Sequence, residues 1–310
     1  MRSAQAGQLP RRTAARLALV VSACIVPATL IALLLIGYDY YDRERERLTR
    51  DSMTTARALI AAVDAELDGV RSALLALATS PHLSSANFAA FHGQAESALQ
   101  GQAFVNVILS DRSGRQLINT FRPFGEPLPA QGDPGGLLRV FETGTPVISG
   151  LFQGRVTRSY IVGVGVPVRR DGEVRYALTA GLSPDRLSQM LTQQKLPQGW
   201  IAGILDGSGT IVARTVEAER LIGQKGSPEL VRRMREVQED AFESRTLEGI
   251  PVLTVMSRSS VSGWAVAIGI PQRELTAHLW YSMARLFIAA FIALITALGL
   301  AALLGRRLMR

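Results

Sequence analysis

The sequence predicts an α+β fold held between two membrane-spanning helices. Two long uncharged runs lie near the ends of the chain, and a helix-like segment with a regular apolar stripe follows the first of them. A β-rich unit then recurs 95 residues further along. These observations predict, in order, a transmembrane helix, a long helix, two antiparallel-sheet modules in tandem and a second transmembrane helix.

The net charge of +8 belongs to the ends of the chain and not to its middle. All 26 acidic residues lie between Asp39 and Glu274, whereas eight of the 34 basic residues lie outside 39–284. The middle is therefore formally neutral. It offers no concentrated basic face, so we expect no nucleic-acid partner. The excess arginines instead indicate membrane topology.

Residues 17–38 and 282–305 are the predicted membrane spans. Both contain long uncharged stretches, and each is long enough to cross a hydrocarbon core of about 30 Å as a helix. Arginines precede the first run and follow the second, which places the tail 1–16 and the end 306–310 in the cytoplasm and residues 39–281 outside. A cleaved signal peptide is the alternative for the first run, but its apolar length exceeds the about 7–15 residues of such peptides.

A long helix is predicted at 39–79, where Ser80-Pro81 stops it. An apolar heptad stripe runs along it. Such a stripe either forms the seam of a homodimer or packs on the chain's own globular part, and the pattern does not say which partner is buried. The stripe consists of Met53, Ala56, Ile60, Val63, Leu67, Val70, Leu74 and Leu77.

The first β-rich module is predicted at about residues 100–190, after a short helix at 87–99. The runs FVNVILSD (104–111) and QLINTF (116–121) alternate as strands do and flank an RSG turn. A short helix and the strand PVISG follow a proline-rich loop. The runs 160–168 and 173–182 are then predicted to pair as a hairpin through RRDG.

The second module, at about residues 198–275, repeats the first. ILSDRSGRQLINT (108–120) is echoed by GILDGSGTIVART (203–215), with Asp111 matching Asp206 and Thr120 matching Thr215. The shared Asp-x-Ser-Gly predicts a turn in each copy, because Asp bonds nearby backbone and Gly supplies a positive φ. We do not expect either aspartate to be catalytic.

Several segments resemble the double Cache sensor domain. They are LINTFRPFGEPLP (117–129), YIVGVGVPVRRDGEVRY (160–176), GWIAGILDGSGTIVART (199–215), RLIGQKGSPEL (220–230), LEGIPVLT (247–254) and SGWAVAIGIP (262–271). The resemblance covers about residues 17–305 and is strongest to the periplasmic input half of bacterial HWE-type sensor histidine kinases. It implies two PAS-like modules beside a long helix, an inner-membrane location with residues 39–281 in the periplasm, and binding of a small molecule outside that is sensed inside.

The resemblance also nominates a ligand site in the distal module, under loops that span 122–136 and 149–160 here. Arginine and tyrosine donors would suit a carboxylate, and Arg158 and Tyr160 share one side if their segment is extended. In the amino-acid-binding version an Asp stands near the position of Thr179, so a carboxylate, another small anion or no ligand stays open. The nominated residues are Arg122, Ser149, Phe152, Arg155, Arg158 and Tyr160.

No catalytic, metal or cofactor site is predicted. The three histidines lack ligand spacing with one another or with Cys24, and no phosphoacceptor-histidine or ATP-binding motif occurs. We therefore expect a non-enzymatic sensor whose kinase module follows in a longer form or belongs to a partner. The alternative is a non-signalling or partner-dependent interaction protein with a truncated output and a decayed pocket.

Overall fold

The computed structural model describes residues 10–100, 104–156 and 158–274, together with 284–285, 287–289, 291–292, 295–296 and 299. The chain divides into two units, one from Thr49 to Pro271 and one formed by Met1–Leu48 with Gln272–Arg310. Both sheets and the candidate site lie in the first of these units.

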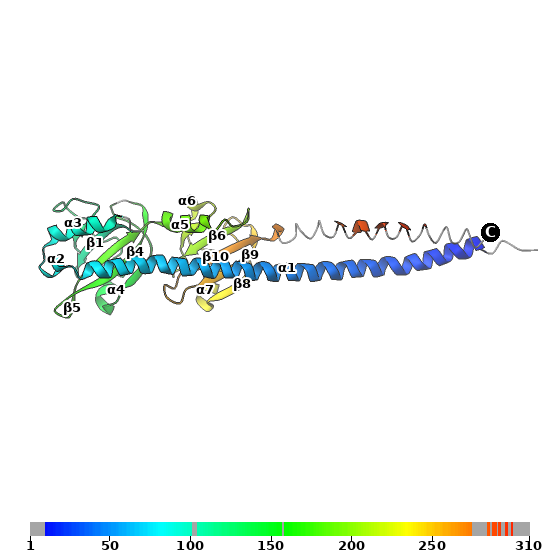
Figure 1. Cartoon of the computed structure of the whole chain (residues 1–310), viewed down its shortest axis with the longest axis horizontal. Coiled ribbons are helices and arrows are strands. Elements are labelled where there is room, and N and C mark those ends of the chain that lie inside the picture. Colours follow the sequence, from blue (N-terminus) through cyan, green and yellow to red (C-terminus); the bar gives the residue numbers. More distant parts are fainter. Residues whose placement is uncertain are drawn as a thin grey trace, which may run out of the picture. The chain divides into compact units, whose positions relative to one another are not determined.

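Helix α1 extends from Pro10 to Ala78, and its part from Thr49 onward runs along both sheets (Figure 1). The stripe from Ala56 to Leu77 is buried within the single chain, where it joins side chains of both sheets in one apolar core. Packing on the chain's own globular part is thus confirmed for these residues, and they are not free to form a dimer seam. Homodimerisation itself stays a prediction.

Within the described part of the chain, no helix is both long and apolar enough to span a membrane. The backbone of the first predicted span, 17–38, belongs to α1. The second predicted span, 282–305, falls mostly outside the described residues. The two spans and the topology drawn from them stay predictions.

The distal module contains a five-stranded antiparallel sheet in the order β2-β1-β5-β4-β3. All five predicted strands are confirmed, and the RRDG hairpin turns through Asp171 and Gly172, whose φ angles are 52° and 82°. The elements are α2 (Pro81–Ser84), α3 (Phe88–Leu99), β1 (Phe104–Asp111), β2 (Gln116–Asn119), α4 (Pro134–Thr143), β3 (Val147–Gln153), β4 (Tyr160–Arg170), β5 (Glu173–Leu182) and α5 (Pro184–Gln193).

The proximal module contains a second five-stranded sheet in the order β7-β6-β10-β9-β8, which is the same order shifted by five strands. This identity of topology confirms an α+β fold built from a duplicated unit. The elements are β6 (Ile201–Leu205), β7 (Ile211–Arg214), α6 (Ala218–Leu221), α7 (Pro228–Glu236), β8 (Glu239–Arg245), β9 (Pro251–Arg258) and β10 (Ala265–Pro271).

The duplication extends to individual hydrogen bonds. The Asp111 carboxylate accepts the N–H of Ser113 at 3.0 Å, and the Asp206 carboxylate accepts that of Ser208 at 2.9 Å. The glycine that follows has a φ of 85° in the first turn and 80° in the second. Both Asp-x-Ser-Gly segments are therefore turns, as predicted.

A hydrogen bond joins the two modules directly. The Leu151 N–H, in β3 of the distal sheet, donates to Asp206 Oδ2 at 3.0 Å, and Asp206 is only 1% exposed. Leu151 follows an irregularity in the pairing of β3 with β4 that begins after Ile148. The bulge in β3 therefore turns a backbone donor toward the proximal module.

Candidate functional site

A cavity of about 50 Å³ lies in the distal module, between the sheet and the segments that cover it. Its floor comes from β1, β4 and β5, and its cover from residues 131–133, the first turns of α4, β3 and residues 154–156. One water requires about 10–15 Å³ on this measure. The cavity therefore suits a ligand of a few heavy atoms.

The cavity exists because β4 alternates valine with glycine. Val162 and Val164 are fully buried in the core under α1, whereas Gly163 and Gly165 line the cavity on the opposite face. A Cβ on Gly163 would lie 3.2 Å from the hydroxyl oxygen of Ser149. Two small residues on the inner face of one strand thus keep the floor open.

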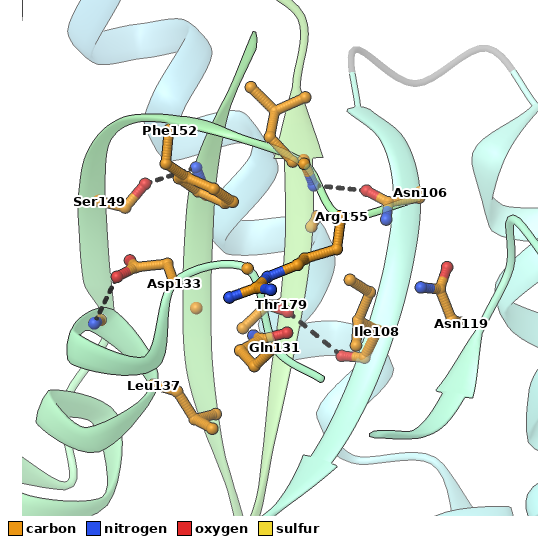
Figure 2. A pocket seen from close by; sticks show the side chains of 18 of the residues that line it. Asn106, Ile108, Asn119, Gln131, Asp133, Leu137, Ser149, Phe152, Arg155 and Thr179 are labelled. Atoms are coloured by element: carbon orange, nitrogen blue, oxygen red, sulfur yellow. Dashed lines mark hydrogen bonds between the residues drawn. The ribbon is translucent and has the colours of Figure 1, made fainter. Parts of the chain in front are cut away.

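Buried amide side chains form much of the polar lining. Asn119 Nδ2 donates to Gln116 Oε1 at 2.9 Å, and Gln116 Nε2 donates to Gln131 Oε1 at 3.3 Å. Asn106 Oδ1 accepts the Gly181 N–H at 3.0 Å (Figure 2), while its Nδ2 has no hydrogen-bond partner within the described residues. The lining can therefore offer amide donors to a ligand as well as apolar contact.

The wall is completed by Ser149 and Phe152 from β3 and by Thr179 from β5. The Ser149 hydroxyl accepts the Gly163 N–H and donates to the carbonyl of Gly150, both at 2.7 Å. Within the described part of the chain, the Thr179 hydroxyl has only a long contact of 3.5 Å to the Ile108 carbonyl. Ser149 is thus fixed by its partners, whereas the Thr179 hydroxyl is available to a ligand.

Arg155 and Asp133 are the charged residues of the lining. Figure 2 shows the Arg155 side chain reaching across the cavity, with its guanidinium over Gln131 and Thr179 in this view. It makes no ion pair or hydrogen bond within the described residues. Asp133 caps α4, because its Oδ1 accepts the Gly136 N–H at 2.9 Å. An unpaired guanidinium is suited to a carboxylate.

The structure brings three of the six nominated residues to the cavity: Ser149, Phe152 and Arg155. Arg122 instead lines a separate open hollow beside His92, where it lies 3.5 Å from the carboxylate of Glu126.

Arg158 and Tyr160 are also absent from the cavity lining. Arg158 is exposed and has a φ of 54°, and its N–H closes a turn on the Gly154 carbonyl at 2.9 Å. Tyr160 is 45% exposed and packs over Gly223 so closely that a Cβ there would overlap its ring. The segment before β4 is a turn and not an extended strand, so Arg158 and Tyr160 do not share one side as predicted.

The buried amides are not among the site residues predicted from the sequence. A signal existed in FVNVILSD, where the strand alternation places Asn106 and Ile108 on one face and Val107 and Leu109 on the other. Asn106 is a polar residue on the same face of the sheet as Gly163 and Gly165 of β4, and this combination indicates a cavity with a polar lining. Gln131 and Asp133 lie in an irregular loop, where no such periodicity applies.

The chain matches the Cache domain family over residues 40–279, in the double (dCache) form. No curated protein matches the sequence at a significant level.

Solved structures share the fold at low sequence identity. The ligand-binding domain of the Pseudomonas fluorescens chemoreceptor CtaA, in complex with L-isoleucine, has 14% identity and a TM-score of 0.57, with 76% of this chain and 96% of that chain covered. The ligand-binding domain of the Campylobacter jejuni chemoreceptor Tlp3, in complex with L-valine, has 13% identity and a TM-score of 0.55, with 77% of this chain and 97% of that chain covered. The extracellular domain of mmHK1S-Z2, described as a histidine kinase, has 13% identity and a TM-score of 0.58, with 74% of this chain and 98% of that chain covered. Because the family match covers most of the sequence, the chain belongs to the double Cache domain family.

Proposed function

We propose that this protein is a membrane-anchored sensor of the periplasm whose distal module binds a small carboxylate-bearing molecule. The protein acts as the input half of a two-component histidine kinase and signals the occupancy of the distal module across the inner membrane. The observation that carries the ligand class is the unpaired Arg155 guanidinium over a small cavity lined by buried amides. The similar folds of chemoreceptor domains solved with amino acids support a ligand of this size.

The ligand is held by charge at one end and by apolar contact along its body. Arg155 is placed to donate two parallel hydrogen bonds to a carboxylate, a geometry that lysine cannot supply. Phe152, Leu137 and Ile161 provide apolar walls. The ligand shifts the balance between two arrangements of the covering segments, and this shift is what the rest of the chain transmits.

Calorimetric titration of the purified full chain with a panel of small carboxylates and amino acids tests the site. We expect Arg155→Ala to weaken binding of the best ligand about 10- to 100-fold, the value of a charge-assisted hydrogen bond. Arg158→Ala is the matched control, because this arginine lies three residues further on and outside the lining. Equal losses in the two variants would contradict the assignment.

A substitution at Asp133 tells whether the ligand is a simple carboxylate or an amino acid. Asp133→Asn keeps a good N-cap for α4 but removes the negative charge. If the ligand carries an ammonium group, the substitution weakens binding; if it is a simple carboxylate, the substitution strengthens binding by removing repulsion.

A panel in which no compound binds would favour the alternative function, a non-signalling interaction protein with a decayed pocket.

A further inference from the structure

The proximal module contains its own cavity, of about 70 Å³, at the position equivalent to the distal one. The matched lining residues on the first two strands of each module are 95 positions apart, and the strand registers agree with this pairing. In the proximal cavity, Gly203, Ile211 and Arg214 take the places of Ile108, Gln116 and Asn119. The duplication has therefore produced two cavities with different chemistry.

Arg214 is the main chemical difference between the two cavities. It is 7% exposed, and its Nη2 donates to Glu248 Oε2 at 3.0 Å. Its Nη1 and the other carboxylate oxygen of Glu248 are both buried and have no partner within the described residues. An unpaired buried donor is costly unless something accepts from it. Arg214 thus has a hydrogen bond to give at a cavity wall.

The charge balance around the cavity favours an anion. Burial is the largest single influence on Glu248 and raises its pKa, but hydrogen bonding to Arg214, Thr246 and backbone, together with the positive charge of Arg214, outweighs burial, so the pKa lies below its usual value. Glu248 is therefore ionised and neutralises Arg214. Arg245 is a second cation of the lining, and its contact is the Gly249 carbonyl at 3.3 Å, not a carboxylate. One positive charge remains in excess.

The remaining lining suits a short hydrocarbon chain. Aliphatic side chains form the walls, and α7 begins at the cavity with Ser227 as its N-cap. A helix N-terminus adds to the attraction for an anion. The aliphatic residues are Ile201, Leu205, Ile211, Leu230, Leu247, Val252 and Ala267.

We propose that the proximal cavity is a second binding site, which takes a small monocarboxylate with a short alkyl chain. A slight rotation of the guanidinium turns Arg214 Nη1 to the bound carboxylate while Nη2 stays on Glu248. This site is independent of the distal one and does not depend on the ligand proposed there.

Titration of the full chain with propionate tests the proposal, with Arg155→Ala and Gly203→Val as the two decisive variants. A Cβ at Gly203 would lie 3.5 Å from the Ala213 carbonyl and 4.0 Å from Arg214 Cγ, which are ordinary contacts. Gly203→Val should therefore fold and fill the cavity. We expect propionate still to bind Arg155→Ala, through the proximal cavity, and we expect Gly203→Val to weaken that remaining binding at least about 10-fold when it is added to Arg155→Ala.

A double variant gives an independent test of the ion pair. Arg214→Met with Glu248→Gln removes both charges together, so no lone buried charge remains, and propionate binding should again be lost. Binding that falls in Arg155→Ala and is unchanged in Gly203→Val would place propionate in the distal cavity. That result would overturn the proximal site while leaving the proposed function intact. A full chain that binds no propionate at millimolar concentration would also overturn it.

Discussion

Asp111 and Asp206 occupy equivalent turns, but their second carboxylate oxygens have different partners. Asp111 Oδ2 receives the exposed Arg115 side chain at 3.2 Å, whereas Asp206 Oδ2 receives the Leu151 N–H from the other module. Burial would raise the pKa of Asp111, but the hydrogen bonds from Ser113 and Arg115 lower it overall. The same turn thus serves local geometry in one module and contact between modules in the other.

Asp206→Ala should destabilise the protein more than Asp111→Ala. Both substitutions remove the turn hydrogen bonds, but only the first leaves the Leu151 N–H without its acceptor, at a cost of about 1–3 kcal/mol. Denaturant unfolding of the two variants measures the difference. Equal free energies of unfolding would mean that the link between modules contributes nothing.

Three of the six nominated residues line the cavity and three do not, and the reason is conformational. Ser149, Phe152 and Arg155 line the cavity because β3 and the residues after it lie beside β4, as the resemblance implied. The pairing of Arg158 with Tyr160 assumed an extended chain, but a positive φ at Arg158 breaks the alternation. Single non-glycine residues with positive φ carry no clear sequence signal.

At the scale of elements, α1 shows what a periodic pattern can and cannot specify. The alternation of three and four spacings predicted both the helix and its apolar face, since these depend on residues close in sequence. The partner of that face depends on how distant strands fold. A homodimer seam and packing on the chain's own sheets would give the same pattern. The burial of Val63 and Leu67 against both sheets decides between them.

Leu67→Ala should lower the free energy of unfolding by about 2–5 kcal/mol, because it leaves a cavity between α1 and the sheets. Leu75, on the same helix, is 40% exposed, so Leu75→Ala should cost far less. Thermal or denaturant unfolding compares them. A larger loss at Leu75 would mean that the outer face of α1 is covered in solution, as in a dimer formed through that face.

The contact of α1 with β8 should make stability depend on pH. Arg57 Nε and Nη2 donate to the two Glu239 carboxylate oxygens at 2.7 and 2.6 Å, and this hydrogen bonding lowers the pKa of Glu239. A depressed pKa in the folded state stabilises above the ordinary glutamate value of about 4.3 and ceases to do so as pH falls through the folded value.

Glu239→Gln should therefore be less stable than the wild type at neutral pH, and the gap should close in acid. Unfolding midpoints of both proteins across the acid range measure it. A gap that stays constant with pH would show that the ion pair contributes nothing.

For the whole molecule, the arginine-flanked runs predict that residues 39–281 lie outside and both termini inside. A reporter active only after export should work when inserted at Gly172, a loop position with open space around it. A reporter active only in the cytoplasm should work when fused after Arg310. Activity of the exported reporter at Arg310 would overturn the two-span topology.

The α1 stripe contributes to a single apolar core that includes side chains of both sheets, such as Val164 in the distal module and Val266 in the proximal one. Neither sheet can lose this helix without exposing the core of the other. The two copies are therefore one cooperative folding unit despite their internal repetition. A destabilising substitution in either module should lower the stability of both, and neither cavity should persist once the other module has unfolded.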